Sequence, residues 1–134
     1  MRRTKRAIAI LVLGLLALRL YAEIVPLGAS PLPWLLARIN GPVLSSPARV
    51  AVSISYNDAG AMHSGDHWCW IVQRHWLLGN RVVASGYIGA GIAVENPSAW
   101  NWMDGRTLQA PSEPRPQASS RRQPRLPRVI RIGG

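Results

Sequence analysis

The sequence contains no phenylalanine, only one lysine and only one cysteine in 134 residues. A single cysteine, Cys69, cannot form an internal disulfide, so it is either a buried free thiol or joined covalently to a partner. The motifs GxxxxGK[ST], GxGxxG and GxSxG are also missing, so the sequence carries no signal of a phosphate loop, a dinucleotide-binding fold or a serine hydrolase. Without phenylalanine, the six tryptophans must supply much of the apolar bulk of a folded core.

Acidic residues are few, and the excess of basic residues lies at the two ends of the chain. The formal net charge of +10 divides into +5 over residues 1–22, zero over 23–96 and +5 over 97–134. A chain that is basic throughout would suggest nucleic acid as a partner, whereas this distribution indicates a membrane-orienting head and a cationic tail on a neutral domain. Nucleic acid is therefore not the expected partner.

The N-terminal segment has the pattern of a membrane-targeting helix. The basic stretch RRTKR at 2–6 precedes the apolar run Ala7–Leu18. Continued to Leu27, this run reaches 21 residues, or about 30 Å as a helix, which is enough to cross a bilayer. Arg19 and Glu23 interrupt it four residues apart, a spacing at which the two side chains can pair on a helix.

Orientation and processing are predicted from the same segment. Positive charges ahead of the apolar run place the N-terminus in the cytoplasm and the remaining chain outside, as in a single-pass protein of a bacterial inner membrane. The tripeptides Leu20-Tyr21-Ala22 and Leu27-Gly28-Ala29 match the A-x-A cleavage pattern poorly. An uncleaved signal anchor is therefore favoured over a cleaved periplasmic or secreted protein. The buried helix of a soluble protein is a third alternative, which the flanking charges disfavour.

Composition divides the chain into four segments. Residues 1–28 form the signal anchor, 29–47 a Pro-rich linker, 48–108 a small extracytoplasmic domain, and 109–134 a disordered tail rich in arginine and proline. In the linker, Trp34 is either an interfacial aromatic that follows a membrane span or the one packed tryptophan of a plain linker.

Two stretches determine the expected fold class. Residues 49–56, RVAVSISY, alternate between apolar and polar side chains, which is typical of a half-buried strand. The next stretch predicts an antiparallel hairpin with the two-residue turn Gly79-Asn80. This register sets Trp70 opposite Gly89 and Trp68 opposite Gly91. The sequence thus predicts an N-terminal transmembrane or signal helix, a small mainly-β domain and a disordered basic tail. The alternative is an α+β domain with a helix at 66–78.

The densest chemistry lies in GDHWCWIVQRHW at 65–76. As a strand, this stretch places His67, Cys69 and His75 on one face, and together with His63 they are weak candidates for a zinc or copper site. Their spacing matches no strong metal motif. A Cys–His nucleophile pair would also need an electropositive pocket and an orienting group. No metal, cofactor or catalytic residue is therefore expected.

The other face of the same strand and the tail offer candidate binding surfaces. Three tryptophans and an arginine on this face either stack on a ligand or form a core face; they are Trp68, Trp70, Arg74 and Trp76. Six arginines of the tail are spaced by Pro and Ser and could attract an anionic surface; they are Arg115, Arg121, Arg122, Arg125, Arg128 and Arg131.

The function expected from these features is interaction rather than catalysis. The chain is predicted to be a membrane-anchored accessory protein outside the cytoplasm, with a protein partner or an anionic envelope polymer or lipid bound through its tail. One alternative is a nucleic-acid-binding protein that uses the same tail, which would require inverted topology. The other is a small metal-binding or enzymatic domain built on the His and Cys residues.

Overall fold

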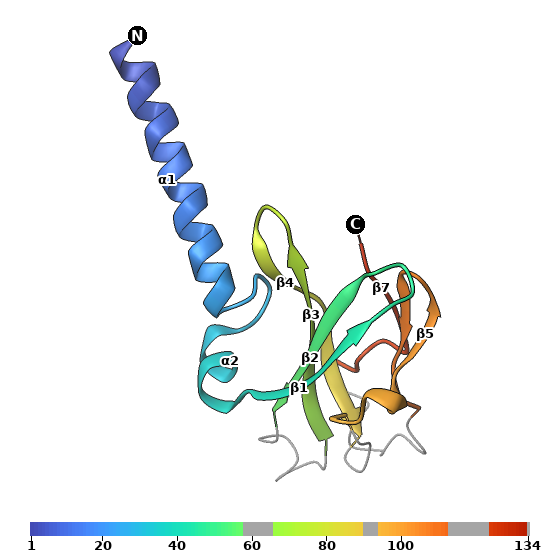
Figure 1. Ribbon diagram of the computed structural model, residues 1–134. Helices are drawn as coiled ribbons and strands as arrows, with labels where there is room; N and C mark the ends of the chain where they lie inside the picture. The colour runs from blue at the N-terminus through green and yellow to red at the C-terminus, as the bar shows by residue number, and fades with distance from the viewer. Residues whose placement is uncertain (58–65, 90–93, 113–123, 134) are drawn as a thin grey trace.

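The structure, a computed structural model, describes residues 1–57, 66–89, 94–112 and 124–133. A long N-terminal helix is followed by two small antiparallel sheets (Figure 1), so the predicted fold class is confirmed. The helix α1, Arg2–Ile24, leaves its apolar side chains exposed over most of its length. It is long and apolar enough to cross a membrane or to act as a signal anchor.

The first sheet holds four antiparallel strands in chain order. They are β1 Ile39–Ser45, β2 Ala51–Asn57, β3 Asp66–His75 and β4 Gly79–Gly89. The strand predicted at 49–56 is confirmed as β2, and the strand interpretation of the next stretch is confirmed against the helical alternative. Both faces of β3 are buried, which favours the β-branched and aromatic residues that it contains.

The second sheet is smaller and completes the core. After the 3₁₀ turn η1, Pro97–Ala99, it has the order β5-β6-β7; the strands are β5 Asn101–Asp104, β6 Thr107–Gln109 and β7 Val129–Arg131. Cys69 and Ile71 of β3 share one hydrophobic cluster with Leu108 of β6 and Ile130 of β7. The second sheet thus covers one face of the first.

The opposite face of β3 is covered from the N-terminal side. Trp70 and Val72 pack against Val25, which follows α1, and against Trp34 of the short helix α2, Pro31–Ala37. The Trp34 and Trp70 rings meet edge to face at 5.4 Å between centroids. The indole N–H of Trp34 donates to the Ile24 carbonyl oxygen at 2.8 Å, which gives a carbonyl of the last turn of α1 a partner. Trp34 is therefore a packed residue.

The β3–β4 hairpin turns earlier than predicted, and the expected Trp–Gly pairs are wrong. Its loop is the three residues 76–78, followed by Gly79 in the left-handed region at φ +81°. This is a common hairpin geometry, in which glycine supplies the left-handed residue that follows a three-residue loop. The observed partners are Tyr87 for Trp68 and Ser85 for Trp70, and Gly91 lies outside the described residues.

The two segments predicted as a linker and as a disordered tail both contain regular secondary structure. The stretch predicted as a linker, 29–47, forms α2 and then β1, which pairs with β2 and buries Leu44. The stretch predicted as a disordered tail, 109–134, ends in β7, which pairs with β6 and buries Ile130. Composition misses both because a few buried apolar residues are enough to fix a short strand on an existing sheet. Residues 113–123 of the tail lie outside the described residues.

Candidate functional site

The histidines and the cysteine of β3 do not form one site. His67 and Cys69 lie on the same face of the strand, where the His67 ring contacts the Tyr56 ring at 5.9 Å. His75 is six residues from Cys69, which is about 20 Å along an extended strand. His63 lies outside the described residues, and no cluster of three metal-ligating side chains occurs among those the structure describes.

His75 is committed to the backbone of the hairpin. Its Nδ1 accepts hydrogen bonds from the amide N–H groups of Leu77 and Leu78 at 3.2 and 3.1 Å, and its ring stacks on Trp76. An imidazole in this position holds the loop closed, because it gives two amides of the turn an acceptor. Its place in the structure is that of a turn-stabilising residue.

Cys69 is fully buried in the core between the two sheets. Burial raises the pKa of its thiol from 9.0 to about 12. A nucleophilic cysteine needs the opposite, namely a thiolate favoured by an electropositive and partly exposed pocket.

Native Cys69 is therefore expected to resist alkylation. At pH 8 its thiolate population is about a thousandth of that of an ordinary thiol, and the reagent cannot reach it. Folded protein treated with iodoacetamide should keep an unmodified mass, whereas protein in guanidinium should react fully. The variant Ser98→Cys, which carries an exposed second thiol, serves as the control and should gain one label. Fast labelling of native Cys69 would contradict its burial.

The tryptophan face of β3 is covered rather than open. Trp70 is only 2% exposed because α2 lies over it, and Trp68 packs edge to face on Tyr87 at 4.8 Å. Trp76, at 79% exposed, sits in the hairpin loop, and Arg74 is exposed beside it. The four residues proposed as a ligand platform are thus divided between the core and the hairpin tip.

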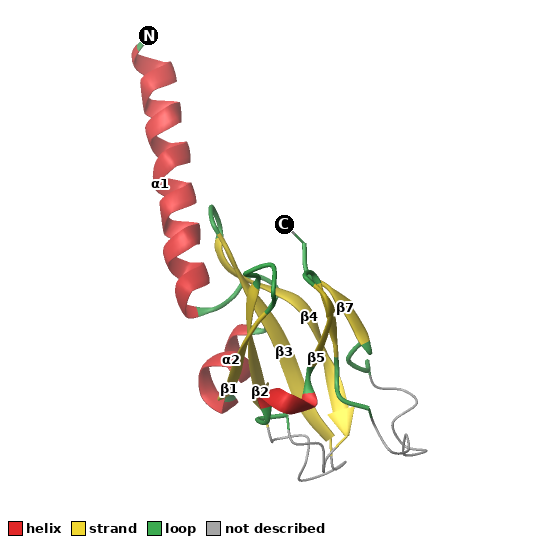
Figure 2. Ribbon diagram, turned by 45° about the vertical axis from the view of Figure 1, so that its right-hand side comes forward, coloured by secondary structure: helices red, strands yellow, loops and turns green. Residues whose placement is uncertain are grey.

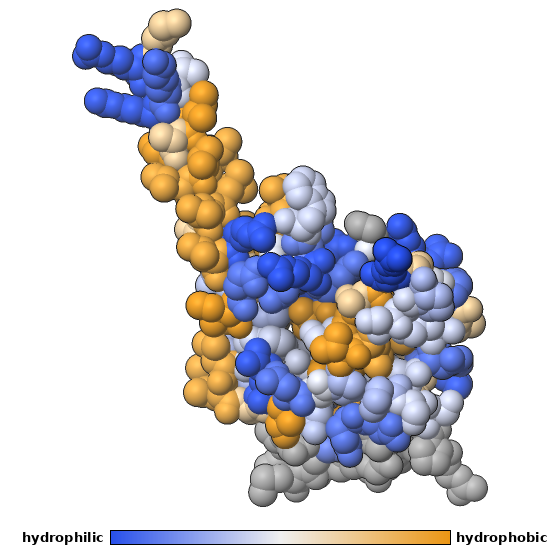
Figure 3. Space-filling view, viewed as in Figure 1, coloured by the Kyte–Doolittle hydropathy of each residue, from blue (hydrophilic) through white to orange (hydrophobic). Residues whose placement is uncertain are grey.

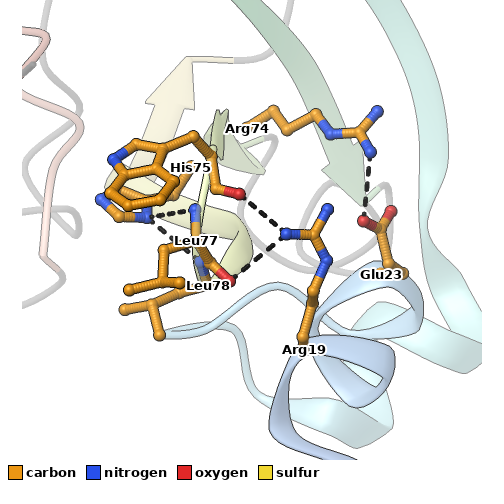
Figure 4. A network of polar contacts seen from close by, with 7 residues as sticks. Arg19, Glu23, Arg74, His75, Leu77 and Leu78 are labelled. Carbon is orange, nitrogen blue, oxygen red and sulfur yellow. Dashed lines mark hydrogen bonds and ion pairs between the residues drawn. The ribbon is translucent and has the colours of Figure 1, made fainter. Parts of the chain in front are cut away.

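The hairpin tip is attached to the last turns of α1 (Figure 4). The Arg19 guanidinium donates to the carbonyl oxygens of Trp76 and Leu77 at 2.7 and 3.4 Å, and Glu23 forms an ion pair with Arg74 at 3.4 Å. The spacing of Arg19 and Glu23 allows them to pair with each other, but each binds the hairpin instead. The loop carbonyls need hydrogen-bond donors, and Arg19 supplies them. Arg74 lies close enough to Glu23 to take the place of Arg19 as its ion-pair partner.

Close backbone contacts reinforce this junction. A Cβ on Gly79 would lie 3.3 Å from both the Ala22 Cβ and the Arg19 carbonyl oxygen, so glycine allows the hairpin to approach the helix. The Leu27 amide donates to the Asn80 carbonyl at 3.0 Å, and the Val82 amide donates to the Leu27 carbonyl at 2.8 Å. Leu27, just after α1, thus forms a short parallel β-bridge with Arg81 of β4.

Three turns and the C-terminal segment gather at the end of the domain beside α1 (Figures 1 and 2). The Ser46 hydroxyl of the β1–β2 turn donates to the Gly105 carbonyl of the β5–β6 turn at 2.8 Å, and the Ile132 amide donates to the Arg106 carbonyl at 2.8 Å. Six arginines lie on these turns or on the adjoining parts of α1, β3, β4 and β7, and we call this surface the basic end: Arg19, Arg49, Arg74, Arg81, Arg106 and Arg131. Hydrophilic side chains are prominent over this region (Figure 3).

A cavity of about 470 Å³ opens within the basic end. Arg106 and Arg131 line it together with Asp104 and Thr107. Asp104 accepts from the Arg106 amide at 2.7 Å and from the Thr107 hydroxyl at 3.0 Å. These two hydrogen bonds, the backbone one first, lower the pKa of the Asp104 carboxyl below its usual 3.8. Both oxygens of this carboxylate are thus engaged at the turn, while the two arginines are exposed.

The sequence-based prediction placed the binding arginines in the tail and missed the basic end. Of the six tail arginines, Arg115, Arg121 and Arg122 lie outside the described residues. Among the described ones, Arg125 forms a parallel bridge with Tyr87 of β4, Arg128 donates to Ser112 at 3.2 Å, and Arg131 alone of these three belongs to the basic end. The predicted strand order could have indicated the basic end, because consecutive antiparallel strands place every second turn at the same end of a sheet.

Apolar side chains are also exposed on α2. Leu32, Leu35 and Leu36 all point away from the core, while Trp34 on the same helix is buried. This apolar surface continues that of α1 toward the lower part of the domain (Figure 3). Clustered apolar exposure of this kind is typical of an interaction surface.

Comparison with known proteins adds no relative. No family model matches the chain, and no curated protein or solved structure is significantly similar to it.

Proposed function

We propose that the chain is a single-pass membrane protein whose β domain lies outside the cytoplasm and acts by binding, not by catalysis. The junction between α1 and the hairpin is the observation that carries this proposal. An exposed apolar helix that is merely a targeting signal has no need of side-chain partners in the mature domain. Here Arg19 and Glu23 of α1 both bind the β3–β4 hairpin, which supports a helix that stays with the domain.

The residues around the two weak cleavage sequences also support an uncleaved anchor. Ala22 and Val25 are buried against the domain, and Leu27 is hydrogen-bonded to β4 in both directions. Cleavage after Ala22 or Ala29 would detach α1, and the later cut would also remove Val25 and Leu27 from their packing. An uncleaved chain keeps all of these contacts.

The environments of the chemical side chains support interaction over catalysis. Cys69 is buried with a raised pKa, and the Nδ1 of His75 is occupied by two backbone amides. By contrast, the basic end and the exposed leucines of α2 are surfaces available to partners. We therefore propose an accessory role in an envelope, with an anionic surface or a protein as the partner.

Fusion reporters at the C-terminus test the topology. Alkaline phosphatase fused after Gly134 should be active, and a fluorescent protein that folds only in the cytoplasm should be dark at the same position. The full-length mass should stay in the membrane pellet after an alkaline carbonate wash. A control variant with the four basic residues of 2–6 changed to glutamate should reverse the reporters, because these charges orient the helix.

Two outcomes would contradict the proposal in different ways. A fluorescent cytoplasmic fusion of the unaltered chain would favour the nucleic-acid alternative. A soluble periplasmic product that lacks residues 1–22 would show that the helix is a cleaved signal.

A further inference from the structure

We infer that the basic end binds the anionic phospholipid headgroups of the bilayer that holds α1. This inference rests on the membrane anchoring proposed above and identifies the anionic partner. Four parts of the structure support it: the position of the basic end, its charge, its cavity and the exposed tip of the hairpin.

The position of the basic end is fixed by α1. Contacts of Arg19 with the loop carbonyls and of Ala22 with Gly79 hold the hairpin tip beside the last two turns of the helix. Arg19 lies five positions before Ile24, which is about 7.5 Å along the helix axis. When α1 crosses a bilayer, the hairpin tip therefore reaches the headgroup region. The other turns lie at the same end of the domain (Figures 1 and 2), so they would approach the same bilayer surface.

The charge of the basic end complements an anionic leaflet. Its six arginines stand against two acids, Glu23 and Asp104, which leaves a net charge of 6 − 2 = +4. Glu23 pairs with Arg74, and Asp104 is bonded within its own turn. Arg49, Arg106 and Arg131 are exposed, so their guanidinium groups can reach phosphate oxygens. Attraction of this kind acts only within about one Debye length of the membrane, where the geometry places this end.

The cavity gives one headgroup a defined place. Arg106 and Arg131 line it from the β5–β6 turn and from β7, so they can approach one phosphate from two sides. The Thr107 hydroxyl and the Gly133 backbone lie in the same lining and can contact the glycerol part of a headgroup. A phosphatidylglycerol headgroup carries these two features, a phosphate anion and hydroxyl groups.

The tip of the hairpin has the composition of an interfacial anchor. Trp76 is 79% exposed and Leu77 is about half exposed, and both sit in the loop whose carbonyls Arg19 satisfies. Tryptophan is favoured at the headgroup level because its ring is apolar and its N–H needs a polar partner. Arg19 thus has two roles. It donates hydrogen bonds to the loop carbonyls, and these bonds hold its charged group at the hairpin and away from the lipid tails.

Depth of the tip is tested on the full chain in nanodiscs. A fluorescent nitrobenzoxadiazole group is placed by Leu77→Cys, with buried Cys69 left in place, and nitroxide lipids act as quenchers. The label at 77 should be quenched, and a label from Ser98→Cys should not be, because η1 lies at the opposite end of the domain (Figure 1). Equal exposure of both labels to solvent in a properly incorporated chain would overturn the inference.

Headgroup preference is tested by titration of the full chain in neutral detergent micelles. Short-chain phosphatidylglycerol should bind more tightly than short-chain phosphatidylcholine, and added salt should reduce the difference. The double variant Arg106→Gln/Arg131→Gln should lose about 30-fold of this preference, and Arg49→Gln about 5-fold. The charge-matched control Arg121→Gln/Arg122→Gln removes two tail arginines and should leave the preference unchanged.

The outcomes separate this inference from the proposed function. If the chain does not enter nanodiscs at all, the membrane anchor itself fails. If it enters but shows no headgroup preference, or if only the tail variant reduces it, the basic end is not the site. Tighter binding of soluble polyphosphate than of phosphatidylglycerol, lost in the same Arg106 and Arg131 variant, would assign the site to an envelope polymer instead of lipid.

Discussion

A chain that ends at residue 123 is expected to lose the cooperative unfolding transition of its β domain. The missing segment buries Leu126, Ile130 and Ile132 in the core shared by the two sheets. At about 1.5–3 kcal/mol for each buried side chain, the loss amounts to roughly 5–9 kcal/mol, which is comparable with the whole stability of a typical domain. Thermal unfolding followed by near-ultraviolet circular dichroism would show the loss of the transition.

A shorter deletion provides the control for this experiment. A chain that ends at Ile132 lacks only the last two glycines and keeps the hydrogen bond that the Ile132 amide donates to the Arg106 carbonyl. It should unfold within a few degrees of the full chain. If the chain that ends at 123 also unfolded at the full-length temperature, β7 would contribute little to the core, and the tail would be dispensable as its composition suggested.

Replacement of Trp70 by alanine is expected to destabilise the domain by about 3–5 kcal/mol. The Trp70 ring fills the space between β3, Val25 and Trp34, so its removal leaves a cavity in this cluster. Because Trp34 also bonds to the end of α1, the variant should loosen the helix junction as well. Urea titration gives the free energy, and faster proteolysis after residue 24 would report the junction.

Trp76→Ala is the matched control, because it removes the same side chain from an exposed position. Its ring contributes a stacked contact with His75 and is otherwise in solvent, so the change in unfolding free energy should stay below about 1 kcal/mol. Similar destabilisation by the two substitutions would contradict the assignment of Trp70 to the core and Trp76 to the surface.

The parts of the fold that follow local patterns could be predicted from the sequence. A continuous apolar run identifies α1, and strict alternation identifies β2. The strand character of 66–75 follows from its enrichment in Trp, Val and Ile and from the turn residues after it. The two faces of β3 also follow from alternation, although the pattern alone does not say that both are covered. A period of two gives the direction of side chains, and burial depends on what packs against them.

The parts that were missed depend on contacts between distant segments. The turn at 76–78 could not be read from composition, because Gly79 fits either as a turn centre or as the left-handed residue after a three-residue loop. Only the strand lengths and the packing of Gly79 on Ala22 favour the second. Likewise, the partners of Arg19 and Glu23 are 57 and 51 residues away in the sequence. The i,i+4 rule considers only neighbours on the same helix, so it could not identify them.

The β domain is completed by both ends of the chain, and this has a consequence for its biosynthesis. One face of β3 is covered by Val25 and Trp34, which come early in the sequence. The cluster on the other face includes Leu126 and Ile130, which come late. In the membrane-anchored chain proposed above, α1 enters the bilayer first, and the core stays open until residues 124–132 have been made. During that interval the edge of β6 that β7 later covers is unpaired, and it is open to chaperones and proteases. Nonsense mutations that remove β7 should consequently lower the amount of protein more than the few residues lost would suggest.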